Sequence, residues 1–83
     1  MANRLTANAN DPRNGAPVGT SLDELQQAVG GGLIELVYLP DNKLMVVNEE
    51  GLLRNYPFNE AASLLAMGVI VGDVVIADSS EID

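Results

Sequence analysis

Two apolar segments joined by a turn constrain the fold of this chain more than any other feature. Leu33 to Leu39 reads LIELVYL, and Leu44 to Asn48 reads LMVVN. The proline and aspartate of the intervening Pro40 to Lys43 favour a turn, so we expect Leu33 to Asn48 to form an antiparallel hairpin. Because side chains alternate between the faces of a strand, both faces of this hairpin are largely apolar and both need a cover.

A short helix is expected before the hairpin. Ser21 and Glu24 fit a capping box at its start, and the glycines Gly30 to Gly32 supply the positive φ angles that end a helix. Apolar residues three and four positions apart form one stripe along this helix. The stripe consists of Leu22, Leu25, Ala28 and Val29.

A second short helix is expected after the hairpin. Asn59 is a favourable N-cap, and Glu60 to Met67 reads EAASLLAM before Gly68 ends the helix. The buried positions predicted for it are Ala61, Leu64 and Leu65.

The remaining segments complete a small sheet. Glu49 to Gly51 predicts a tight turn with Gly51 in the left-handed conformation, and a short third strand is expected to begin at Leu52 and Leu53. The last strand region covers residues 69–71 and 74–77, with Gly72-Asp73 interrupting it as a bulge or turn. The order predicts an α+β fold, with a mainly antiparallel sheet of three to four strands and two short helices.

Charge divides the chain into three parts. Residues 1–20 carry two arginines and one aspartate, a net of +1, and their Asn, Gly and Pro content predicts a flexible N-terminal tail. Residues 21–83 carry eleven acids against Lys43 and Arg54, a net of −9. The compact domain is expected at 21–77, with an acidic C-terminal tail at 78–83. A two-faced apolar sheet with two short helices also predicts a homo-oligomer, unless both helices cover one face and the tail shields the other.

Composition excludes several function classes. The chain has no His and no Cys, so it lacks the commonest general base, the thiolate nucleophile and the usual zinc ligands. We therefore expect no catalytic residue, no metal site, no cofactor and no enzyme activity. The net charge of −8 argues against direct contact with nucleic acid or an anionic membrane. The absence of a signal-peptide core and of a long apolar run predicts a soluble, cytoplasmic protein.

Two candidate sites are weak. Glu49, Glu50 and Asp73 could bind a divalent cation if the sheet brought them together, but the two glutamates lie in a predicted turn, and adjacent strand residues point to opposite faces. The Gly30 to Gly32 triplet follows a helix, whereas a phosphate-binding loop precedes one, so it is interpreted as a helix stop.

Residues 54–59 form the stretch most typical of a ligand site. Arg54 is one of two cations in the acidic domain, Tyr56 and Phe58 offer stacking surfaces, and Asn55 and Asn59 offer amide groups. Such a set suits a small planar polar ligand such as a nucleobase. The structural alternative is that Phe58 fills the core, Asn59 caps a helix and Arg54 pairs with an acid. For Asn48 the same two alternatives are open: it is either a turn residue or a ligand contact.

Four runs of sequence resemble a known family. They are Gly32 to Val37, Asn48 to Gly51 (NEEG), Asn59 to Ala62 and Ile70 to Ile76 (with GD between apolar residues). Together they resemble the domain of unknown function numbered 3846, found in phages and bacteria, over Leu22 to Ala77. The resemblance implies a phage or mobile-element source and carries no established activity.

Two hypotheses follow for function. The first is a non-enzymatic oligomer that binds a nucleotide-like ligand at Arg54, Asn55, Tyr56, Asn59 and Asn48, and sequesters an immune signal of the host. The alternative is an acidic mimic of nucleic acid that inhibits a basic host nuclease or defence protein. A structural or regulatory protein of the virion is a third class.

Overall fold

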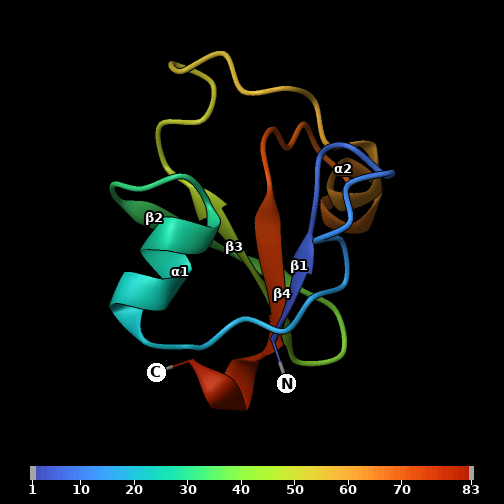
Figure 1. Ribbon diagram of the computed structural model, residues 1–83. Coiled ribbons are helices and arrows are strands. Elements are labelled where there is room, and N and C mark those ends of the chain that lie inside the picture. Colours follow the sequence, from blue (N-terminus) through green and yellow to red (C-terminus); the bar gives the residue numbers. More distant parts are fainter. Residues whose placement is uncertain (1, 83) are drawn as a thin grey trace.

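The computed structural model describes residues 2–82 and contains one antiparallel sheet, in the order β1-β4-β3-β2, with two helices (Figure 1). The hairpin and the α+β class predicted from the sequence are confirmed. The strands are β1 (Asn3–Leu5), β2 (Ile34–Leu39), β3 (Lys43–Asn48) and β4 (Val74–Asp78). The helices are α1 (Leu22–Ala28), α2 (Glu60–Ala66) and the short 3₁₀ helix η1 (Ser79–Glu81).

One face of the sheet is covered by α1. The Ser21 hydroxyl caps this helix by accepting from the Glu24 amide at 3.2 Å, and the helix turns its apolar stripe inward. Figure 1 shows α1 and α2 on opposite sides of the sheet. The core beneath α1 is formed by Ala2, Leu25, Ala28, Val29, Val46, Val75 and Ala77. Leu22, predicted on the same stripe, is the first residue of α1 and is 61% exposed.

The other face is covered by α2. Asn59 caps this helix, as predicted, by accepting from the Ala62 amide at 3.0 Å. The core on this side is formed by Met45, Val47, Ala62 and Val74. Both faces of the sheet are thus apolar, as the hairpin sequence indicates, and each is covered by one helix.

The buried positions predicted for α2 were wrong. Leu64 is 74% exposed and Leu65 is 51% exposed, and Ala61 is exposed too, whereas Ala62 is fully buried. A small side chain facing the sheet allows the helix backbone to approach closely, and it directs the leucines away. The C-terminal end of α2 therefore presents apolar side chains to solvent.

The N-terminal segment differs most from the sequence-based expectation of a flexible tail at residues 1–20. Asn3–Leu5 pairs with β4 as an edge strand, and Ala2 and Thr6 are 1% and 3% exposed. The pairing gives β4 a second neighbouring strand and buries Ala2. Amino-acid composition, from which the flexible tail was predicted, carries no information about either contact. Residue 1 lies outside the described residues.

The C-terminal segment also continues the fold. β4 extends to Asp78, η1 follows, and Ile82 packs against the core beneath α1. The acidic tail expected at 78–83 therefore contributes apolar contacts as well as charge. Residue 83 lies outside the described residues.

The loop after β3 contains no strand. Leu52 and Leu53 lie in a turn and are exposed, and the positive φ expected at Gly51 occurs instead at Asn55 (56°). Residues 69–71 form only an isolated bridge between Val71 and Phe58, because Gly72, with a φ of 78°, turns the chain before β4 begins. No helix within residues 2–82 is long and apolar enough to cross a membrane.

Candidate functional site

Asn48 is a buried anchor for the glycine turn after α1. Its side-chain nitrogen donates to the carbonyl oxygens of Val29 at 3.0 Å and Gly31 at 2.8 Å, and its oxygen accepts from the Glu50 amide at 2.9 Å. Asn48 is only 6% exposed. These bonds assign the side chain to positioning the turn, the structural alternative considered for it.

Asn59 has a corresponding structural position. Its side-chain nitrogen donates to the carbonyl oxygens of Leu5 at 3.0 Å and Gly72 at 2.9 Å, while its oxygen caps α2. The residue is fully buried. Both of its N–H groups are therefore engaged by backbone carbonyls that come from opposite ends of the chain.

Arg54 and Tyr56 converge on the same glycine turn. Nη1 of Arg54 donates to the carbonyls of Gly30 and Gly31 at 3.2 Å each and to the Tyr56 hydroxyl at 3.0 Å. Its Nη2 pairs with Glu50 at 3.2 Å, which is the acid pairing considered from the sequence. The Tyr56 hydroxyl lies against Gly30, so a side chain there would collide with it.

Asn55 and Phe58, the other residues of the predicted stretch, have separate places. Asn55 adopts a left-handed turn conformation and is exposed. Phe58 is 55% exposed rather than filling the core. Of the predicted ligand residues, the structure brings Arg54 and Tyr56 together at the surface, whereas Asn48 and Asn59 are buried and hydrogen-bonded to backbone groups.

A cleft of about 390 Å³ lies beside Tyr56, between the C-terminal end of α1 and the N-terminal segment. This volume is within the range of about 300–1,000 Å³ typical of small-molecule sites. We call it the Arg4–Tyr56 cleft. It is lined by Arg4, Arg13, Gln27, Ala28, Val29, Gly30, Tyr56, Pro57, Gly72 and Asp73.

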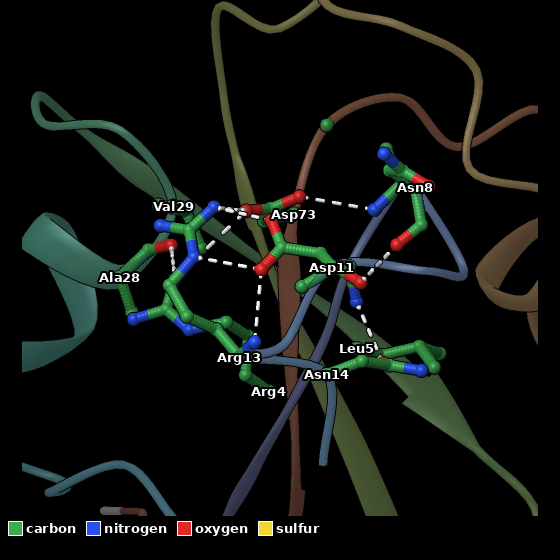
Figure 2. A network of polar contacts seen from close by, with 12 residues as sticks. Arg4, Leu5, Asn8, Asp11, Arg13, Asn14, Ala28, Val29 and Asp73 are labelled. Carbon is green, nitrogen blue, oxygen red and sulfur yellow. Dashed lines mark hydrogen bonds and ion pairs between the residues drawn. The ribbon is translucent and has the colours of Figure 1, made fainter. Parts of the chain in front are cut away.

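Asp73 organises the charged side of this cleft (Figure 2). Its Oδ2 accepts from Arg13 Nη2 at 3.2 Å and lies 4.0 Å from Arg4 Nη1. Its Oδ1 accepts from the Ala7 amide at 3.0 Å. Arg4 also donates to the Ala28 carbonyl at 2.7 Å, at the end of α1. One carboxylate thus orients two guanidinium groups along one wall.

Arg13 is held by a second carboxylate. Its Nη2 lies 2.7 Å from Asp11 Oδ2, and its backbone amide donates to Asp11 Oδ1 at 2.8 Å. The hydrogen bonds from Arg13 lower the pKa of Asp11 from 3.8 to about 2. The Arg13 side chain is 59% exposed, so water screens its ion pair with Asp11. Its guanidinium can therefore exchange a carboxylate for another anion at little cost.

The cleft brings arginine side chains together in an acidic protein, each beside a carboxylate: Asp73 for Arg4, Asp11 and Asp73 for Arg13, and Glu50 for Arg54. Its lining carries two arginines and one aspartate, and Arg54 bonds to the lining residue Tyr56. Three of the chain's four cationic side chains thus gather at this end, although the net charge is −8. This arrangement can bind an anionic group beside an aromatic ring.

Sequence reasoning missed Arg4 and Arg13 because it placed both in a flexible tail. The signal that could have found them is the net +1 of residues 1–20 beside the −9 of the remainder, since opposite charges attract the two parts. Asp73 was considered only with Glu49 and Glu50. Within residues 2–82 there is no group of three or more acidic side chains placed to hold a metal ion.

Comparison with known proteins shows the family. Residues 5–83 match the family described as a domain of unknown function (DUF3846), and the chain belongs to it. The match begins within β1 and so includes Arg13 and Asp73 of the cleft. No curated protein and no solved structure matches the chain.

Proposed function

We propose that this member of the DUF3846 family is a non-enzymatic protein that binds a small nucleotide-like anion in the Arg4–Tyr56 cleft. The observation that supports the proposal is the convergence of Arg4, Arg13 and Tyr56 on one cleft of about 390 Å³. Guanidinium groups bind phosphate through paired hydrogen bonds, and an aromatic side chain offers a stacking surface for a base.

Each lining group has a distinct task in this proposal. Arg4, whose side chain is 18% exposed, is fixed by the Ala28 carbonyl and supplies a permanent charge at the cleft wall. Arg13 is the mobile partner that turns from Asp73 to the phosphate. The ionised Asp73 carboxylate can accept hydrogen bonds but cannot donate them. Once Arg13 has turned to the phosphate, this carboxylate is available to the N–H groups of a base.

In the cell, we propose that the protein sequesters its nucleotide ligand. A protein that holds a nucleotide without converting it lowers its concentration in solution, and we propose a nucleotide signal of a host defence as the ligand, in the cytoplasm of the host. Incubation with the bound nucleotide, followed by denaturation and chromatography, is expected to return it intact. A converted product would contradict the non-enzymatic part of the proposal.

Calorimetric titration with a panel of linear and cyclic nucleotides tests the binding. We expect at least one to bind with a micromolar Kd, and Arg13→Gln to weaken it by about tenfold or more, as loss of a charge-assisted pair implies. Lys43→Gln is the matched control, because it removes the same charge from a residue that pairs with Asp78 outside the cleft.

Two results would reject the site. One is the absence of binding across the panel, and the other is equal weakening by both substitutions. The acidic-inhibitor alternative predicts instead that the protein captures a basic host protein and releases it at high salt.

A further inference from the structure

The two edge strands of the sheet, β1 and β2, differ in whether another segment of the chain bonds to their outer backbone groups. Along β1, residues 15–18 run beside the strand and bond to its outer groups. The Arg4 amide donates to Ala16 O at 2.8 Å, the Gly15 amide donates to Arg4 O at 2.8 Å, and the Val18 amide donates to Ala2 O at 2.9 Å. The chain therefore covers this edge with its own backbone.

The β2 edge has no such cover. Ile34 pairs with Asn48 and Leu39 with Lys43, and Leu33 O accepts from the Glu49 amide. In an antiparallel pair, hydrogen-bonded positions alternate, so the backbone groups of Ile34, Leu36 and Tyr38 point away from β3. Within residues 2–82 no backbone or side-chain hydrogen bond is formed to them.

The outer strand also lacks the usual protection of an exposed edge. Such edges are commonly blocked by proline, lysine or a bulge, and β2 (IELVYL) contains none of these. Its single charge is Glu35. Tyr38 is 77% exposed, and Leu33, directly before the strand, is 62% exposed. An apolar strand of this kind is a template for another strand.

We propose that β2 pairs antiparallel with β2 of a second copy of this chain, about a twofold axis that passes beside Leu36. This register places Leu36 opposite Leu36 and Ile34 opposite Tyr38 of the second copy. All three outward residues then exchange hydrogen bonds. The result is one continuous sheet containing the four strands of each copy.

The strand pairs most completely in this register, because an axis on Val37 would set Ile34 opposite Pro40 and an axis on Glu35 would set two glutamates opposite one another. A shift that centres the axis on Tyr38 would set Leu36 opposite Pro40, which has no amide hydrogen. A shift that centres it on Ile34 would leave Tyr38 without a partner strand residue. The Leu36-centred register also sets Glu35 opposite Val37, so the only charge of β2 does not face its own copy. Charge and hydrogen bonding thus favour a second copy as the partner.

An apolar groove lies at the end of the same edge. The groove, of about 470 Å³, lies between α2 and the sheet and includes Leu39, Leu64, Leu65 and Ile76. In the proposed register, Leu33 of the second copy lies opposite Leu39 and on the same face. The exposed Leu33 would then lie beside this groove, where each copy covers apolar surface on the other.

Sedimentation at submillimolar concentration tests the assembly. The expected wild-type mass is twice the 8.7 kDa of the chain. The double variant Leu33→Lys with Tyr38→Lys is expected to weaken the dimer by at least about tenfold in Kd, through loss of apolar contact and because lysine on an exposed edge strand opposes pairing with another strand. The matched control is Leu53→Lys, which changes a leucine that is 82% exposed in the loop after β3 and should leave the dimer intact.

Hydrogen exchange tests the interface itself. In the dimer, the amides of Ile34, Leu36 and Tyr38 should exchange at least about tenfold more slowly than in the double variant. The amides of Glu35 and Val37, which bond to β3, should be equally protected in both. A single cysteine at Leu36→Cys should also link two copies, because hydrogen-bonded antiparallel pairs have Cα atoms about 5.5 Å apart. A monomeric wild type, or a dimer in which the three outward amides exchange as in the double variant, would overturn the proposal.

Discussion

At the residue scale, the buried amide of Asn59 links three parts of the chain. It caps α2, and its two N–H groups hold the carbonyls of Leu5 and Gly72. We expect Asn59→Ala to lower the free energy of unfolding by at least about 3 kcal/mol, since a lost cap costs about 1 kcal/mol and each of the two unsatisfied carbonyls costs at least about 1 kcal/mol. Urea unfolding measures the change.

Two companion variants separate the roles of Asn59. Asn59→Asp keeps the capping oxygen but loses both donors, so it should remain destabilising. Asn10→Ala, at an exposed turn, should change stability by less than about 0.5 kcal/mol. A neutral Asn59→Ala would contradict the structural role.

The Asp11 carboxyl is expected to titrate at low pH. Because Arg13 lowers its pKa from 3.8 to about 2, the stabilising contribution of the pair is fully present above the unfolded value of 3.8. It is lost as the pH falls through about 2. The carbon-13 chemical shift of the Asp11 carboxyl should show this midpoint.

Arg13→Gln provides the check on the cause. It should raise the Asp11 midpoint toward 3.8, although not fully, because the backbone amide of residue 13 still donates to the carboxylate. An unchanged midpoint would show that Arg13 is not responsible.

At the element scale, β1 belongs to the folded domain. Removal of residues 2–18 would take β1 from β4, Ala2 from the core and the Leu5 carbonyl from Asn59. Because a domain of this size has only about 5–15 kcal/mol of stability, we expect the truncated chain to unfold or to melt far below the full chain. Circular dichroism during heating measures this. An unchanged Tm would restore the flexible-tail interpretation.

The turn before β4 depends on Gly72 for two reasons. Its φ of 78° disfavours any side chain, and an added Cβ would lie 2.7 Å from Cδ2 of Tyr56. Gly31 has a φ of 90° with nothing near its Cβ position. We expect Gly31→Ala to cost about 1–2 kcal/mol and Gly72→Ala about 1–3 kcal/mol more, from overpacking.

Chemical denaturation of the two glycine variants gives the comparison. The difference between them should disappear when Tyr56 is replaced by a smaller residue, as in Tyr56→Ala. Equal costs with Tyr56 present would show that the ring does not press on Gly72.

At the scale of the whole molecule, the sequence predicts those elements whose signals are local. The hairpin follows from its apolar runs and its turn, and the helices follow from the caps at Ser21 and Asn59. β1 has only three residues and a mixed pattern, so its strand state comes from pairing with β4. The orientation of α2 is set by how closely Ala62 approaches the sheet, which helical periodicity does not specify.

The candidate site is predicted in part for the same reason. Tyr56 and Arg54 belong to one polar and aromatic stretch, which a local reading detects. Arg4 and Arg13 reach the cleft only because β1 joins the far edge of the sheet, a contact between positions distant in sequence. Asn48 and Asn59 resemble ligand residues in sequence, because an amide that anchors backbone and one that binds a ligand have the same chemistry.

The most direct test of the central claim is nitrogen-15 NMR of the full chain during titration with the same panel of linear and cyclic nucleotides as in calorimetry. Binding in the Arg4–Tyr56 cleft predicts saturable shifts concentrated at the amides of Arg4, Arg13, Gly30, Tyr56 and Asp73, with Lys43 and Ala66 unchanged. Absence of saturable shifts with every nucleotide of the panel, or shifts centred on the apolar groove beside α2, would contradict the claim.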